Sequence, residues 1–141
     1  MDIWTKAKRS QVMSLIRSKN TKPEKTVRSF LHGLGFRFRL HRRDLPGCPD
    51  IVMTKYRMVI FVHGCFWHFH KNCRDGKIPK TDSKRWRKKL LGNARRDENS
   101  LTKLRRAGWR TAVIWECELR KSGTKALRRI VKQIRNARHI C

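Results

Sequence analysis

Acidic residues and long apolar runs are both scarce in this sequence. Only 10 Asp and Glu stand against 37 Lys and Arg, so the formal net charge of the 141 residues is +27. No apolar stretch approaches the roughly 18 residues needed to cross a bilayer, and Met1-Asp2-Ile3-Trp4 lacks the apolar core of a secretion signal. Repeats and Pro/Gly/Ser-rich linkers are absent as well. We therefore expect a single domain over residues 1–141 that is neither secreted nor bound to a membrane.

The excess of positive charge implies a polyanionic partner. Hydrophobic residues make up 38% of the chain, and they occur in periodic runs, which indicates a folded domain with a basic surface rather than a disordered tail. A surface of this charge attracts phosphate-bearing polymers. Two classes of protein meet that requirement: a non-catalytic binder of the ribosomal or nucleoid type, and an enzyme that acts on nucleic acid.

Hydrophobic spacing predicts helices at both ends of the chain. Residues 1–20 form a basic segment in which residues 5–19 have the pattern of a short, weakly amphipathic helix. Thr21 and Glu24 then have the spacing of a capping box, and we expect the helix that they open to end at Gly33 or Gly35. Apolar residues repeat with helical period in this helix and in a final one. They are Val27, Phe30, Leu31, Leu34 and then Leu127, Ile130, Val131, Ile134.

Short apolar runs between these helices predict a small mixed sheet. The expected elements, in chain order, are an edge strand at 36–40, a loop at 41–49, a buried hairpin of 51–53 with 58–62, a loop at 63–79, a long helix from Asp82 or Ser83 to about 107, and a buried strand at 111–115. This order of elements predicts an α/β layered fold with a small central sheet flanked by helices.

The cysteines indicate a metal site rather than disulfides. Their number is odd, at five, and a chain without a secretion signal is expected in a reducing compartment. Cys65, His70 and Cys73 lie in one loop, and Cys117 directly after a strand is the best fourth ligand, which makes a Cys₃His set suited to structural Zn²⁺. His68 in the same loop is the alternative histidine ligand. The competing interpretation is a group of unrelated thiols, and neither Cys48 nor Cys141 has an assigned role.

One carboxylate and two further histidines are candidates for catalysis. Asp50 comes at the start of a predicted strand, where a carboxylate can hold Mg²⁺ against a phosphate. His63 and His68 lie in the same loop as the predicted zinc ligands and are not needed for the zinc site. Either histidine could therefore serve as a general base or bind water. The alternatives are an ion pair between Asp50 and a basic residue, and histidines that merely line the loop.

Three strings together resemble the very short patch repair (Vsr) DNA mismatch endonucleases. They are Leu45-Pro46-Gly47-Cys48-Pro49-Asp50, His63-Gly64-Cys65-Phe66-Trp67-His68 and Trp115-Glu116-Cys117. The resemblance implies a restriction-endonuclease-like fold and a Mg²⁺-dependent nick in duplex DNA, 5′ of the thymine in a T:G mismatch. It also implies a bacterial cytoplasmic protein that meets other mismatch-repair proteins. No pattern indicates a dimer seam, so we expect a monomer.

The resemblance also implies roles for single residues. Asp50 and the main-chain carbonyl of Val62 match the Mg²⁺ ligands, and His68 matches the general base. His63 and Asp97 match residues that hold metal-bound waters, and Glu24 matches a helix glutamate beside the base. From the residues alone, Glu24 is equally a capping-box acid. Asp97, four residues after Asn93 on one helix face, is equally the partner of Arg95, Arg96 or Lys103.

The usual PD…(D/E)xK nuclease pattern is broken after Asp50, where His63 and His68 replace the lysine. A base with the ordinary histidine pKa of about 6.5 predicts nicking that slows below about pH 6. Phe66, Trp67 and Trp86 match aromatics that wedge into the base stack, although without the resemblance they are core residues. The rival interpretations are a zinc-stabilised nucleic-acid binder without catalysis and a restriction-type nuclease that cuts matched DNA.

Overall fold

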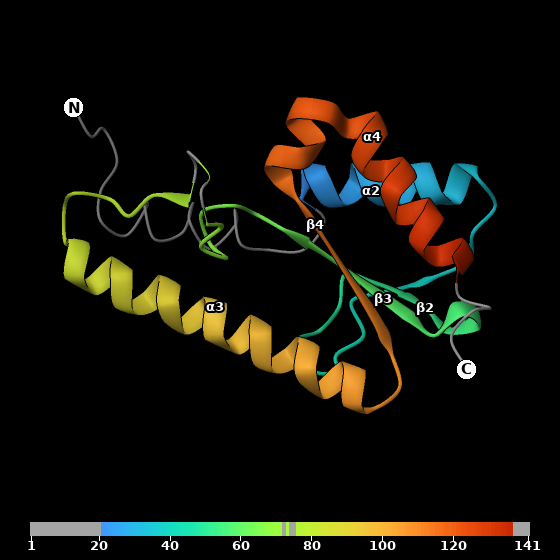
Figure 1. Cartoon of the computed structure of the whole chain (residues 1–141), viewed down its shortest axis with the longest axis horizontal. Coiled ribbons are helices and arrows are strands. Elements are labelled where there is room, and N and C mark those ends of the chain that lie inside the picture. The colour runs from blue at the N-terminus through green and yellow to red at the C-terminus, as the bar shows by residue number, and fades with distance from the viewer. Residues whose placement is uncertain (1–20, 72, 74–75, 137–141) are drawn as a thin grey trace.

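The computed structural model describes residues 21–71, 73 and 76–136, and the helix expected within residues 5–19 lies outside them, as does Cys141. The elements in chain order are α2 (Lys22–Gly33), β1 (Arg39–Leu40), β2 (Ile51–Met53), a 3-10 turn (Thr54–Tyr56), β3 (Met58–His63), α3 (Ser83–Arg106), β4 (Arg110–Trp115) and α4 (Glu116–Arg135). In Figure 1, α2 and α4 lie on one side of the sheet and α3 on the other. None of the described helices is both long and apolar enough to span a membrane.

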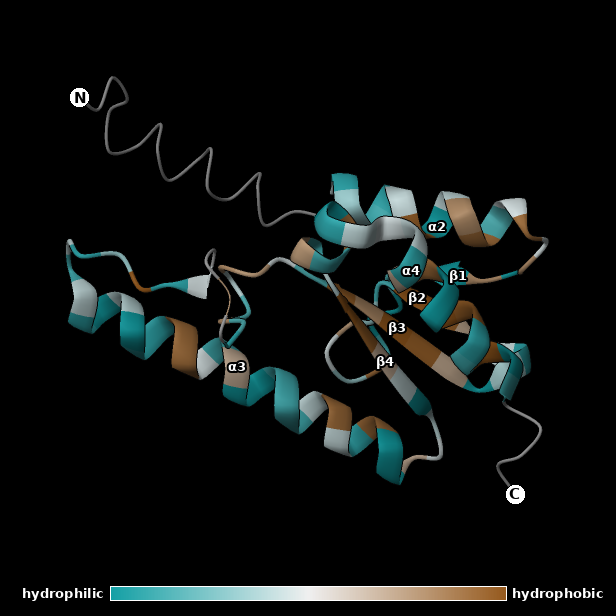
Figure 2. Cartoon of the chain, turned by 45° about the horizontal axis from the view of Figure 1, so that its top comes forward, coloured by the Kyte–Doolittle hydropathy of each residue, from teal (hydrophilic) through white to brown (hydrophobic). Residues whose placement is uncertain are grey.

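The four strands form the mixed sheet that the apolar runs predicted. Their order is β1-β2-β3-β4, with antiparallel pairing in the first two pairs and parallel pairing between β3 and β4. Alternate residues of the strands face opposite layers. Ile51 and Ile60 belong to the core under α2 and α4, whereas Val52 and Val59 belong to a smaller core with Leu104 of α3. Figure 2 shows the hydrophobic colour concentrated on these central strands.

Helices α2 and α3 begin and end close to the predicted residues. The Thr21 hydroxyl accepts a hydrogen bond from the Glu24 amide at 3.4 Å, which caps α2. Helix α3 is followed by Gly108 at φ 92°, a left-handed conformation that glycine adopts without steric penalty. Helix α4 starts directly after β4 and bends at Ser122, and most of its buried residues, from Ala126 to Ile134, follow the bend. The α/β prediction is therefore confirmed.

Three local predictions were wrong. The edge strand has only two residues, because the amide of Phe36 bonds to the Leu31 carbonyl at 3.1 Å and completes the end of α2 instead of pairing in the sheet. His63 is the last residue of β3 and not part of the following loop. Strand β4 is only partly buried, because it is the outermost strand of the sheet.

Candidate active site and metal centre

The strand directions bring distant residues to one edge of the sheet. Strand β3 ends at His63, its parallel neighbour β4 ends at Trp115, and the antiparallel β2 begins there, directly after Asp50. The Val62 amide donates to Asp50 Oδ2 at 2.7 Å, which fixes this carboxyl group against β3. Cys117 in the first turn of α4 reaches the same edge. The sheet topology thus explains why the predicted site residues lie close together.

Gly47 brings the loop before Asp50 against α3. It has a φ of 75°, and a Cβ atom there would lie 2.8 Å from Ser100 Cβ and 3.3 Å from the Phe61 ring. A side chain at this position would collide with Ser100, crowd the Phe61 ring and strain the backbone. The glycine therefore allows the close contact that sets the position of Asp50.

A buried glutamate and a histidine accompany Asp50. Glu24, 3% exposed, belongs to the first turn of α2, and its Oε1 lies 2.9 Å from His41 Nε2. Burial and the hydrogen bond with Glu24 raise the pKa of Asp50 to about 8. Oxygen and nitrogen atoms of these three side chains all lie within 4.8 Å of one another. The cluster can thus hold a divalent cation, which would favour the ionised carboxylate.

Two stacked histidines form a second cluster. The rings of His63 and His68 lie 3.8 Å apart and nearly parallel, and His68 Nδ1 lies 2.6 Å from Asp97 Oδ2. Burial, with the neighbouring His68, lowers the pKa of His63 to about 3, so its imidazole is neutral. Its buried Nδ1 has no hydrogen-bond partner among the described residues. A buried polar atom of this kind fits a site that receives water or a solvated metal ion.

The two clusters line one cavity of about 630 Å³. Glu24, His41 and Asp50 contribute to its lining, as do the two histidines with Asp97. Asn93 also lines it and donates to the Trp67 carbonyl at 3.0 Å, so it contacts the loop after β3. Asp97 and Asn93 therefore share a cleft, as their helical spacing predicted. Asp97 pairs with His68, however, where the competing interpretation paired it with Arg95, Arg96 or Lys103.

Glu24 and His68, which the resemblance places side by side, line the same cavity but belong to different clusters of possible metal ligands. Glu24 lies in the cluster with His41 and Asp50, and His68 lies in the cluster with Asp97. His41 was not among the predicted site residues. No pattern could have found it, because His41 lies 17 residues from Glu24 in a loop that only the packing of α2 against the sheet brings near.

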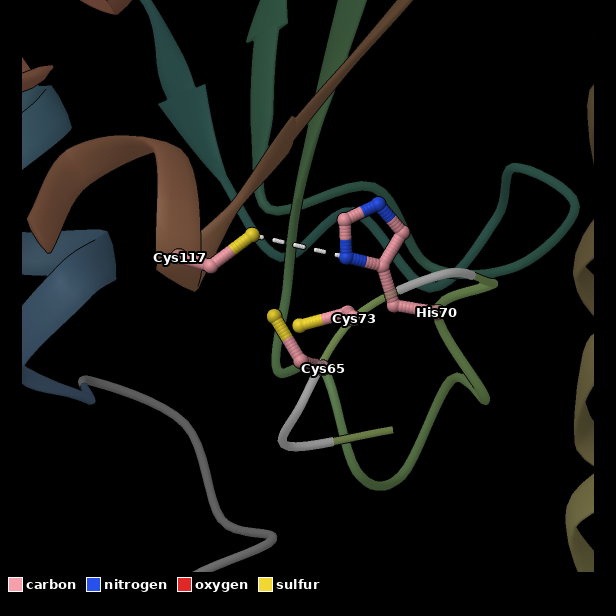
Figure 3. Close-up of side chains that lie close together, drawn as sticks. All are labelled: Cys65, His70, Cys73 and Cys117. Atoms are coloured by element: carbon pink, nitrogen blue, oxygen red, sulfur yellow. Dashed lines mark hydrogen bonds between the residues drawn. The ribbon is translucent and has the colours of Figure 1, made fainter. Parts of the chain in front are cut away.

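Three cysteines and one histidine form the predicted metal-binding set. The Sγ atoms of Cys65, Cys73 and Cys117 and a ring nitrogen of His70 all lie within 4.8 Å of one another. Figure 3 shows the four side chains pointing toward one another, with Cys117 coming from the start of α4. Its Sγ is 3.4 Å from His70 Nδ1. It is thus His70 that joins the cysteines, and His68 belongs to the other cluster.

The donor set of this cluster fits a thiophilic cation. Burial raises the pKa of the Cys65 thiol to about 12, so a thiolate at neutral pH needs a positive charge beside it. Three sulfur atoms and one imidazole nitrogen are the usual ligands of a closed tetrahedral zinc site. The His70 ring also stacks on Trp115 at 3.9 Å, and Trp115 contacts His63 at 5.1 Å. The cluster is therefore joined to the histidines of the cavity through one indole ring.

The three predicted wedge residues pack together beside the cavity. Phe66 contacts Trp67 with ring centroids 4.9 Å apart and Trp86 of α3 at 5.4 Å. All three are only partly buried, and Lys89 lies 5.7 Å from both indole rings. They are therefore neither core residues nor fully exposed, and they form an aromatic surface next to basic side chains.

Carboxylates and imidazoles face one cavity at the strand ends of a mixed α/β sheet, on a strongly basic chain, and this arrangement is typical of a nuclease-type site that could hold a divalent metal. Comparisons with known proteins agree. The family model "DNA mismatch endonuclease Vsr" matches residues 1–75, and the chain belongs to this family of DNA endonucleases.

Two relatives and one solved structure illustrate the similarity. The type II nicking enzyme V.XorIIP of Xanthomonas oryzae is 53% identical over 116 residues, 82% of this chain and 85% of the relative. The DNA mismatch endonuclease Vsr of Escherichia coli is 44% identical over 119 residues, 84% of this chain and 76% of that protein. The catalytic domain of the homing endonuclease I-Bth0305I shares the fold, with a TM-score of 0.54, 19% identity and coverage of 86% of this chain and 100% of that domain.

Proposed function

We propose that this protein nicks duplex DNA 5′ of the thymine in a T:G mismatch, by Mg²⁺-dependent hydrolysis of a phosphodiester. The observation that carries the proposal is the single cavity in which Asp50 and Glu24 accompany the His68–Asp97 pair. Family membership supports a DNA endonuclease, and it makes a non-catalytic binder the weaker interpretation.

Asp50 and the main-chain carbonyl of Val62 would hold the magnesium ion. When bound, Mg²⁺ polarises the scissile phosphate and lowers the pKa of the attacking water. The carboxyl group of Asp50 is already oriented by the Val62 amide at 2.7 Å. Because burial raises the pKa of Asp50 to about 8, binding of the cation must displace a proton near neutral pH.

His68 is the proposed general base. A carboxylate oxygen only accepts hydrogen bonds, so Asp97 holds His68 in the tautomer whose hydrogen is on Nδ1. Nε2 is then the ring nitrogen with a lone pair that can take a proton from water. His63 stacks on this ring and stays neutral, so it adds no repulsive charge when His68 becomes protonated. His63 and Asp97 would also hold metal-bound waters, and Glu24 would assist Asp50.

Basic and aromatic side chains would bind the DNA. Ten exposed Lys and Arg residues along α3 suit contacts with phosphates. They are Lys84, Arg85, Arg87, Lys88, Lys89, Arg95, Arg96, Lys103, Arg105 and Arg106. Phe66, Trp67 and Trp86 would insert beside the mismatch, where a T:G pair is easier to unstack than a matched pair. Zn²⁺ in the Cys65, His70, Cys73 and Cys117 set would hold the loop that carries Phe66 and Trp67.

A nicking assay tests the proposal. Labelled T:G and matched duplexes are incubated at one salt concentration with Mg²⁺ and without it. We expect a nick only in the T:G duplex with Mg²⁺, and Asp50→Ala should bind this duplex but not nick it. Asp44→Ala is the matched control, because Asp44 is exposed and pairs with Arg42 outside the cavity. Equal cutting of the matched duplex would instead indicate a restriction-type nuclease.

A further inference from the structure

His41 has a left-handed backbone conformation, which is uncommon for residues other than glycine. It follows β1 directly, and its φ is 49°, in the left-handed region that favours glycine and asparagine. Its amide donates to the Asp50 carbonyl at 3.3 Å, which extends the pairing of β1 with β2. This backbone contact does not need a histidine side chain. A strained residue beside a candidate active site is a reason to ask what its side chain does.

The side chain of His41 is directed at Glu24. The imidazole is 12% exposed and the Glu24 side chain 4%, and Nε2 lies 2.9 Å from Oε1. Because a carboxylate oxygen accepts, His41 Nε2 carries the hydrogen of this bond. Arg28 Nη1 lies 3.4 Å from the other oxygen, Oε2. Two donors from different segments therefore hold the carboxyl group of Glu24 in one orientation.

Glu24 needs this support because it is next to Asp50. Carboxylate oxygens of Glu24 and Asp50 and a ring nitrogen of His41 all lie within 4.8 Å of one another. A cation held at Asp50 would therefore lie beside Glu24, whose carboxyl group must keep one orientation to take part in holding it. A donor on Oε1 then keeps Glu24 in place beside the cation.

We propose that His41 is a positioning residue, which orients Glu24 for its part in holding the divalent ion at Asp50. This inference rests on the proposed function. The competing role is a structural tie between α2 and the loop after β1. The two roles predict different results, because asparagine suits the left-handed backbone but has a side chain too short to replace the imidazole at Glu24.

The test compares His41→Asn and His41→Gln in single-turnover nicking of the T:G duplex. We expect His41→Asn to keep or raise the melting temperature while the nicking rate falls about 10- to 100-fold, the usual effect of losing an outer partner of a metal site. KM should change little. His41→Gln should recover most of the rate, because its amide nitrogen can donate to Glu24. His32→Asn is the matched control, since His32 is exposed at the end of α2.

Two further measurements make the result decisive. In a Glu24→Gln background, His41→Asn should cause no further loss of rate, because residues that act through one contact are not additive. Calorimetric titration with Mn²⁺ in the absence of DNA should show about 10-fold weaker binding by His41→Asn. If the wild type nicks no duplex, the proposed function fails, and the Mn²⁺ titration still decides the role of His41. Wild-type Mn²⁺ affinity in His41→Asn, equal losses in His41→Asn and His41→Gln, or additive effects with Glu24→Gln would each overturn the inference.

Discussion

Replacing Asp50 by asparagine should stabilise the metal-free protein while it removes activity. Asparagine has the shape of a protonated aspartic acid, so its oxygen can still accept from the Val62 amide and its nitrogen can donate to Glu24. What changes is the ability to ionise. The substitution therefore separates the charge of residue 50 from its packing.

The magnitude follows from the raised pKa of Asp50. This pKa is about 8 in the folded chain against an ordinary value of 3.8, so between these pH values the folded state retains a proton that the unfolded state has lost. The free energy of unfolding then falls as the pH rises, by up to roughly 1.4 kcal/mol per pH unit. Between pH 5 and pH 7.5 the wild type should lose about 1 to 3 kcal/mol relative to Asp50→Asn, because Glu24 shares the site.

The assay is urea unfolding of both proteins at several pH values, first without and then with Mg²⁺. Without Mg²⁺, Asp50→Asn should be the more stable protein at pH 7.5. Mg²⁺ should stabilise the wild type, by about 2.7 kcal/mol at a concentration 100 times the dissociation constant. The variant should show a much smaller gain, because a neutral amide is a poor ligand for this ion.

Three results would refute this reasoning. They are a variant that is less stable than the wild type at pH 7.5, an unchanged dependence of stability on pH, and equal stabilisation of both proteins by Mg²⁺. Asp44→Asn serves as the control, because the 62% exposed Asp44 side chain lies outside the cavity and its replacement should change neither the pH dependence nor the response to Mg²⁺.

Other parts of the site give further predictions. When the pH falls from 7.5 to 5, His63→Gln should lose about 2 kcal/mol less stability than the wild type. The reason is that the pKa of His63, lowered to about 3, keeps its imidazole neutral in the folded chain while the unfolded chain is protonated. An equal loss of unfolding free energy in both proteins, measured by urea unfolding, would contradict this. Cys117→Ser should lower zinc content, melting temperature and nicking rate together, since His70 stacks on Trp115 against His63; Cys48→Ser should retain the zinc. Trp67→Ala should slow nicking of T:G duplexes about 10- to 100-fold, as expected for one lost stacking contact. An unchanged rate would indicate that Trp67 only packs against its neighbours and does not contact the DNA bases.

Local patterns were sufficient for the arrangement of elements. The apolar runs of residues 51–53 and 58–62 become an antiparallel pair, and the Thr21 cap opens α2 as its spacing predicted. Patterns were insufficient at element ends. The edge strand is shorter than predicted because the amide of Phe36 donates its hydrogen bond to the end of α2 instead of to the sheet. The hydrophobic period of the sequence gives no information about which of these two bonds forms.

The sequence by itself determined the polyanionic partner, the mixed α/β sheet and the family, because charge, hydrophobic period and the string from His63 to His68 are properties of consecutive residues. It also pointed to the four members of the Cys/His cluster. Only the tertiary structure decided which acid meets which histidine. His41 reaches Glu24 across 17 residues and Asp97 reaches His68 across 29, and both contacts depend on how α2 and α3 pack on opposite faces of the sheet. Hydrophobic burial fixes that packing without regard to the polar side chains that it brings together.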